Sequence, residues 1–277
     1  MDITASMVKT LREQTGAGMM DCKKALVDTN GNFDEAVKLL KEKGLAAVAK
    51  RAERVTAEGR IFIRQNSNKL AIVELTCETD FVAKNEEFIK CGEKILDLIF
   101  EKGYTTVEKE LSDVLLDFAT RTRENMSLYK VQVIDVPENS SVGTYIHSDF
   151  KTAGVVVIKG STDDKVKEFA RDCCMHLAAF TPAYVNKAEV PQSYIDEQKE
   201  IFAAQMDQDE KVASKPQNVK DGILQGKINK HLAEICFMDQ MFVKDDKKSV
   251  SAKLDEISKL VGAKLEFVKV QLVLLGK

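Results

Sequence analysis

One order of predicted elements occurs twice in this sequence and constrains the fold more than any other feature. The first copy comprises two strands, two helices and a strand, over about 61–63, 70–75, 84–102, 107–123 and 128–136. The second copy has the same order, over about 142–147, 155–158, 166–177, 250–261 and 265–275. In the first copy, Asn66-Ser67-Asn68 separates the paired strands and is a typical hairpin turn. We therefore expect an α+β fold with a duplicated antiparallel-sheet core covered by helices.

The second copy is interrupted by two further predicted helices. They begin near Pro191 and Pro216 and are joined by a polar turn over 214–218. A short polar turn between two helices favours an antiparallel helical hairpin. Because an inserted hairpin adds little to the core of the repeat around it, we expect an arm. Its surface could contact a partner protein or a second copy of the chain, giving a homodimer or a 2:2 complex.

The N-terminal residues predict a small three-helix domain. Gly16 and Gly44 are placed to end its first and third helices, and Asn32 with Glu35 has the spacing of a capping box. The expected boundaries are 1–45 for the three-helix domain, 46–58 for a linker and 59–140 for the first core subdomain. The second core subdomain comprises 141–187 and 237–277, and the helical hairpin over 188–236 lies between these two pieces.

Composition excludes several classes of protein. Lys and Arg number 41 against 44 Asp and Glu, and the resulting net charge of −3 disfavours a nucleic acid as the main partner. The N-terminus has no basic segment followed by an apolar run, and no apolar stretch reaches the roughly 18 residues of a membrane span. The six cysteines form no C-x-x-C pair. We therefore expect a cytoplasmic protein with reduced thiols and no membrane contact.

No group of residues in the sequence predicts covalent catalysis. The three histidines, His147, His176 and His231, lie outside the common hydrolase and zinc motifs. Cys173, Cys174 and His176 are the best metal candidate, but zinc needs three or four protein ligands and no second pair has suitable spacing. We expect these three side chains to pack in the core, with no metal bound.

Gly16-Ala17-Gly18 begins like a dinucleotide-binding fingerprint. Asp21 stands where the last glycine of that motif would be, and no predicted strand precedes the segment. The helical flanks instead favour a turn between two helices that needs two glycines. We therefore expect no cofactor.

Thr79-Asp80-Phe81-Val82 joins the end of a predicted strand to the start of a helix. In one interpretation, Thr79 or Asp80 caps the helix while Phe81 and Val82 pack into the core. In the other, a carboxylate beside a large apolar side chain enters a site on another protein. The residues alone leave both interpretations open.

Two ordered motifs in this chain resemble the elongation factor Ts family. Residues 12–26, which include Gly16-Ala17-Gly18-Met19-Met20, resemble its N-terminal signature. The second motif is Thr79-Asp80-Phe81-Val82-Ala83-Lys84-Asn85. Segments 145–147, 175–179 and 239–243 fall where similar segments are expected, so the resemblance spans nearly the whole chain. It implies a UBA-like N-terminal domain, a duplicated α+β core and a coiled-coil arm.

The resemblance also implies a function and a set of site residues. Members of the family exchange guanine nucleotide on elongation factor Tu, a GTPase, without covalent chemistry. By resemblance, Thr79, Asp80, Phe81 and Val82 bind this partner and disturb its Mg²⁺ and phosphate site. Further contacts are expected from the second core half and from the N-terminal domain, through His147, Met19 and Met20.

Two departures and one alternative accompany this interpretation. Some family members have a further helix after the last strand, whereas this sequence ends at Lys277, so the contact of that helix is not carried over. The loop over 148–152 is slightly longer than the family pattern.

The alternative function is an RNA- or ribosome-associated module without exchange activity that uses Lys50, Arg51 and Arg54. The excess of acidic residues and the lack of aromatic residues interleaved with basic ones argue against this alternative.

Overall fold

The computed structural model describes residues 2–277, which form two compact units. The first unit extends to Asp135 and includes Asp149–Lys151 and Leu274–Lys277. The second comprises Val136–Ser148 and Thr152–Val273. Every helix within residues 2–277 is too short or too polar to span a bilayer.

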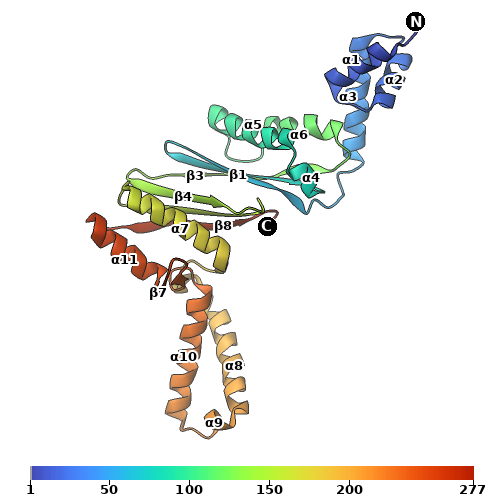
Figure 1. The fold of residues 1–277 in the computed structure, drawn as a ribbon. Helices are drawn as coiled ribbons and strands as arrows, with labels where there is room; N and C mark the ends of the chain where they lie inside the picture. Colours follow the sequence, from blue (N-terminus) through green and yellow to red (C-terminus); the bar gives the residue numbers. More distant parts are fainter. Residues whose placement is uncertain (1) are drawn as a thin grey trace. The chain divides into compact units, whose positions relative to one another are not determined.

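The first unit begins with three helices (Figure 1). They are α1 (Ala5–Thr15), α2 (Met19–Asp28) and α3 (Phe33–Ala49). Their apolar side chains form a small core. Gly16 ends α1 in the left-handed conformation, with φ of 66°, and its N–H donates to the Arg12 carbonyl. The Asn32 side chain accepts a hydrogen bond from the Glu35 N–H at 3.2 Å. Both predicted caps are therefore confirmed.

The predicted end of the third helix at Gly44 is wrong, because α3 continues to Ala49. A Cβ atom at position 44 would lie 2.8 Å from the Cβ of Thr120 and 3.2 Å from its carbonyl oxygen. Thr120 belongs to α6 (Lys109–Arg121), against which α3 packs. The glycine thus allows two helices to approach closely and does not end one of them.

The core of the first unit is an antiparallel sheet in the order β1-β2-β3. Its strands are β1 (Glu58–Asn66), β2 (Lys69–Cys77) and β3 (Met126–Asp135). Helices α5 (Glu86–Lys102) and α6 lie together over one face of this sheet (Figure 1). Large apolar side chains from both layers fill the space between them, among them Val73, Leu75, Phe88, Ile95 and Leu111. A short helix, α4 (Asp80–Ala83), lies between β2 and α5 and was not predicted as a separate element.

The second unit contains a sheet in the order β4-β5-β8. Its strands are β4 (Ser140–Ile146), β5 (Thr152–Lys159) and β8 (Glu266–Leu274). Helix α7 (Asp164–Phe180) packs on β4 and β5, and α11 (Val250–Val261) contacts α7. Both sheets therefore have the predicted element order, and the fold is of the mixed α and β class.

The insertion into the second copy of the repeated element order is helical, as predicted. It comprises α8 (Gln192–Gln208), the short α9 (Glu210–Ala213) and α10 (Gln217–Ile235), with α8 and α10 side by side in Figure 1. The Tyr194 hydroxyl and His231 Nε2 are 2.9 Å apart and join the two long helices. Besides α4, four short elements escaped prediction: α9, a 3₁₀ turn (Lys187–Glu189), β6 (Met241–Phe242) and β7 (Asp245–Ser249). They are too short to show a hydrophobic period.

Candidate partner-binding site

The segment Thr79-Asp80-Phe81-Val82, predicted to bind the partner and called the working segment below, lies where β2 ends and α4 begins. Thr79 is the N-cap of α4, and its hydroxyl accepts a hydrogen bond from the Val82 N–H at 3.4 Å. Asn85 then caps α5 by accepting from the Glu87 N–H at 2.8 Å. Of the two residues that local reasoning offered as a cap, Thr79 is the one that caps the helix.

The base of this segment is held by the residues that precede β3. Glu124 accepts two hydrogen bonds from Thr79, at 3.0 Å from the N–H and at 2.5 Å from the hydroxyl. Beside it, Glu78 accepts from the Asn125 N–H at 2.6 Å and from the Arg54 guanidinium at 3.3 Å. Two carboxylates thus fix the start of α4 at a defined position on the end of the sheet.

The two apolar side chains of the segment have different surroundings. Val82 is partly buried and packs against the main core of the first unit, together with the buried Ala83. Phe81 is 83% exposed. Full exposure of a phenylalanine forgoes roughly 1.5–3 kcal/mol of burial free energy. The interpretation in which both side chains pack into the core is therefore right for Val82 and wrong for Phe81.

Asp80 stands beside this exposed ring and remains charged at neutral pH. Its carboxylate accepts a hydrogen bond from the Lys84 ammonium, one helical turn away, at 2.6 Å. This hydrogen bond is the main cause of the lowered pKa of Asp80. Both side chains are about half exposed or more, so the ion pair adds little to stability. The segment thus presents a carboxylate, an ammonium and an aromatic ring on one rigid turn.

The other predicted contact residues lie on different elements. Met19 and Met20 open α2 and are 54% and 75% exposed, outside the small core of the three helices. His147, in the second unit, is an exposed residue directly after β4. Its N–H donates to the Thr152 carbonyl at 2.8 Å, and its ring lies edge-on to that of Tyr145.

The residues of the metal candidate, Cys173, Cys174 and His176, are buried in the second unit. His176 Nδ1 accepts from the Val243 N–H at 3.2 Å, and its Nε2 lies 2.8 Å from Gln240 Oε1. Burial raises the pKa of the Cys173 and Cys174 thiols. Within residues 2–277, no cluster of three or more His, Cys, Asp or Glu side chains could hold a metal ion. The core role predicted for these three residues is confirmed.

The basic residues of the RNA alternative make contacts within the first unit. Arg51 is buried and donates to the carbonyls of Thr122 and Ala119 at 2.8 and 3.1 Å. Arg54 pairs with Glu78. Arg51 thus holds the linker to the end of α6, and Arg54 holds it to the residue after β2.

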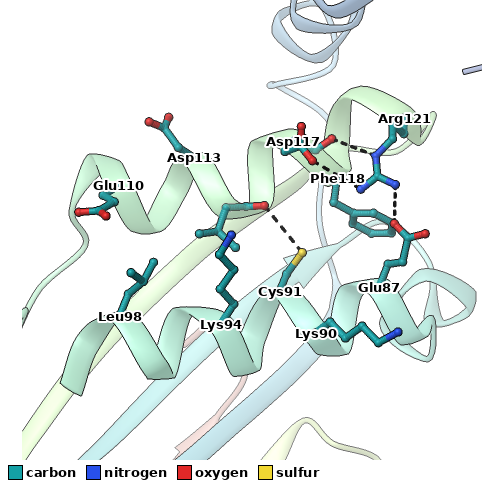
Figure 2. Close-up of a pocket in the computed structure, with 11 residues that line it drawn as sticks. Glu87, Lys90, Cys91, Lys94, Leu98, Glu110, Asp113, Asp117, Phe118 and Arg121 are labelled. Atoms are coloured by element: carbon teal, nitrogen blue, oxygen red, sulfur yellow. Dashed lines mark hydrogen bonds and ion pairs between the residues drawn. The ribbon is translucent and has the colours of Figure 1, made fainter. Parts of the chain in front are cut away.

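A hollow of about 510 Å³ lies between α5 and α6 (Figure 2). Cys91 lies within it, and its thiol is directed at the Val114 carbonyl at 3.8 Å. Arg121 closes one end by pairing with Glu87 at 2.6 Å and Asp117 at 3.6 Å (Figure 2). Burial raises the pKa of the Cys91 thiol, so the hollow contains no activated nucleophile.

Sequence reasoning missed Glu124 and Asn125, which position the working segment. They are 45 and 47 residues from the groups they bind. A polar pair before a predicted strand is a common local pattern and gives no indication of its partner. Only the pairing of β2 with β3 brings these residues to the start of α4.

Comparison with known proteins assigns the chain to a family. A family model described as Elongation factor TS matches residues 78–274. The protein named Elongation factor Ts from Treponema denticola is 52% identical over 281 residues, which covers 100% of this chain and 99% of the relative. Proteins of the same name are 45% identical in Treponema pallidum, with 100% and 99% covered, and 38% identical in Borrelia duttonii, with 100% of both covered. The chain therefore belongs to the elongation factor Ts family.

Proposed function

We propose that this chain is a guanine nucleotide exchange factor for elongation factor Tu and so supports translation elongation in protein biosynthesis. The observation that carries the proposal is the exposure of Phe81, at 83%, on a turn whose base is fixed by Glu124. A large apolar side chain on a turn whose base is already fixed is suited to enter a pocket of a partner, because little backbone freedom is lost on binding. Membership of the elongation factor Ts family supports the identity of that partner.

In this proposal Phe81 acts as a wedge and Asp80 as a charge. The ring enters the GTPase beside its nucleotide and holds a conformation that no longer fits Mg²⁺ and phosphate. The Asp80 carboxylate, ionised at neutral pH, changes the electrostatics of the same charged site. Thr79 and Val82 keep the turn in place from below. No bond is made or broken, so a nucleophile or general base is not needed.

The thermodynamic basis of exchange is negative linkage. If the chain binds the nucleotide-free GTPase better than the GDP form, GDP must weaken binding of the chain by the same ratio. A hundredfold preference corresponds to about 2.7 kcal/mol of coupling free energy. The chain accelerates nucleotide release, while the free nucleotide pool sets which nucleotide replaces GDP.

We propose further contacts through residues on other elements. The exposed Met19 and Met20 are flexible apolar side chains suited to an irregular partner surface. His147 adds a polar contact from the second unit. Each is expected to strengthen binding without taking part in displacement of the Mg²⁺.

The test is release of a fluorescent GDP analogue from elongation factor Tu after mixing with excess unlabelled GDP in a stopped-flow instrument. Added chain is expected to raise the release rate in proportion to its concentration until the complex saturates. A release rate that does not depend on the concentration of the chain would overturn the proposal.

A further inference from the structure

We propose that the first unit contains a binding site for a small polyphosphate anion, in a cavity between the three N-terminal helices and the end of α6. The cavity has a volume of about 650 Å³, within the range of small-ligand sites. Six basic side chains line it, and Asp21 is the one carboxylate among the lining residues. The basic residues are Arg12, Lys24, Lys43, Arg51, Arg121 and Arg123. This proposal goes beyond nucleotide exchange and does not depend on it.

Most of this positive charge is uncompensated. Lys43 pairs with Asp28, and Arg121 pairs with Glu87 and Asp117. The other four basic residues form no ion pair within residues 2–277. In a chain whose net charge is −3, such a local excess concentrates a positive potential in one cavity.

Arg51 supplies an observation of a different kind. It is only 8% exposed, and its two terminal nitrogens donate to the carbonyls of Thr122 and Ala119. Its Nε is buried and has no hydrogen-bond partner. An unsatisfied buried donor costs roughly 1–3 kcal/mol, and more when it is charged. This Nε is covered by protein, so Arg51 contributes the positive charge of its guanidinium to the lining of the cavity rather than a hydrogen bond from Nε.

The N-terminus of α2 lies on another side of the cavity. Gly18 is its N-cap and makes no side-chain capping bond, and the turn from Gly16 to Gly18 lines the cavity. The helix dipole favours negative charge at such an end, and Asp21 in the first turn of α2 supplies one carboxylate there. The glycine pair that resembles a dinucleotide fingerprint thus gains a phosphate-binding role without the fold that usually accompanies it.

The lining residues favour a small polyphosphate over an RNA strand. Single-stranded RNA is bound on aromatic side chains along an open groove, and the lining of this cavity contains no aromatic residue. Several cations around one hollow instead match an anion of high charge and small size. The ligand chemistry is a diphosphate, which inorganic pyrophosphate or the diphosphate of a nucleotide could supply.

The test is calorimetric titration of the chain alone, without any GTPase, with inorganic pyrophosphate and separately with GDP. The double variant Arg12→Gln/Lys24→Gln removes two exposed cavity cations and is expected to weaken binding by on the order of tenfold or more. Lys23→Gln changes the adjacent lysine, which does not line the cavity, and is expected to bind as the unchanged chain does. Circular dichroism checks the fold of both variants.

The outcomes are distinct. Binding of pyrophosphate alone identifies an inorganic anion, and binding of GDP with the same loss in the double variant identifies a nucleotide diphosphate; either supports the site. Amide shifts of Gly18 and Met19 on titration of the unchanged chain locate the ligand independently of any variant. The proposal is overturned if neither ligand saturates, if Lys23→Gln weakens binding as much as the double variant, or if only an RNA oligonucleotide binds.

Discussion

The Glu124 carboxylate accepts two hydrogen bonds from Thr79, one from its N–H and one from its hydroxyl. The same hydroxyl accepts from the Val82 N–H, so one short network connects the segment before β3 to the first turn of α4. Phe81 stands on this turn with almost all of its side chain in solvent. The base of the working segment is therefore ordered before any partner binds.

Replacement of Glu124 is predicted to loosen that base. Glu124→Ala should lower the free energy of unfolding by about 1–3 kcal/mol, because two charge-assisted hydrogen bonds are lost. Urea denaturation measures the change, with Glu138→Gln as a control at an exposed glutamate. In a double-mutant cycle with Thr79→Val, the two changes should not be additive; strict additivity would show that the pair does not interact.

Phe81 and Val82 are predicted to differ in their effects on stability. Phe81→Ala should change the free energy of unfolding by less than about 0.5 kcal/mol, since the ring buries little surface. Val82→Ala should lower it by about 1 kcal/mol, because Val82 packs on the core. Denaturation of the two variants side by side measures both values, and a larger loss for Phe81→Ala would mean that its ring packs on the protein.

The contrast between these neighbours shows where prediction from sequence ends. The strand before the segment and the capping residue at its start followed from local pattern, because strand alternation and capping are set by nearby residues. The outward direction of Phe81 did not, since it depends on how β2 meets α4 and on the distant Glu124. Resemblance to a family, and not periodicity, indicated Phe81 as a residue that contacts a partner.

Substitution of alanine for glycine at two separate positions tests the close approach of α3 to α6. Gly44→Ala should destabilise the first unit despite a gain in helix propensity, because the new Cβ would meet the backbone and Cβ of Thr120. Gly222→Ala in α10 is the matched control: nothing lies within 4 Å of that position, and up to about 1 kcal/mol of stabilisation is expected. Thermal denaturation distinguishes the two, and stabilisation by Gly44→Ala would contradict the packing described.

Gly44 also illustrates an error that local reasoning could not avoid. A glycine near the end of a hydrophobic period predicts a helix terminus, and Gly16 behaves that way. The same residue type inside a helix allows another helix to approach closely, which is a tertiary property. The element order of both sheets was predictable because it rests on many residues, whereas this boundary rested on one.

Buried His176 is predicted to make stability depend on pH. Burial lowers its pKa below the ordinary value near 6.5, so the folded state favours the neutral ring. As pH falls below about 6.5, the unfolded state takes up a proton before the folded state does. The contribution of the neutral His176 ring to stability is therefore complete above about pH 6.5 and is lost as pH falls through the folded-state pKa. Denaturation between pH 7.5 and 5 should show a shallower loss for His176→Gln than for the unchanged chain. Equal slopes would show that His176 does not cause the effect.

The central claim is that Asp80 and Phe81 displace nucleotide from elongation factor Tu. Its most direct test is the rate of release of a fluorescent GDP analogue at saturating concentrations of chain, with Asp80→Ala/Phe81→Ala compared with the unchanged protein. We predict a decrease of more than about tenfold, or about 1.4 kcal/mol in the barrier, with the circular dichroism spectrum unchanged. Val55→Ala, at another side chain that is 83% exposed, should retain the full rate. A double variant that releases GDP as fast as the unchanged protein would contradict the account.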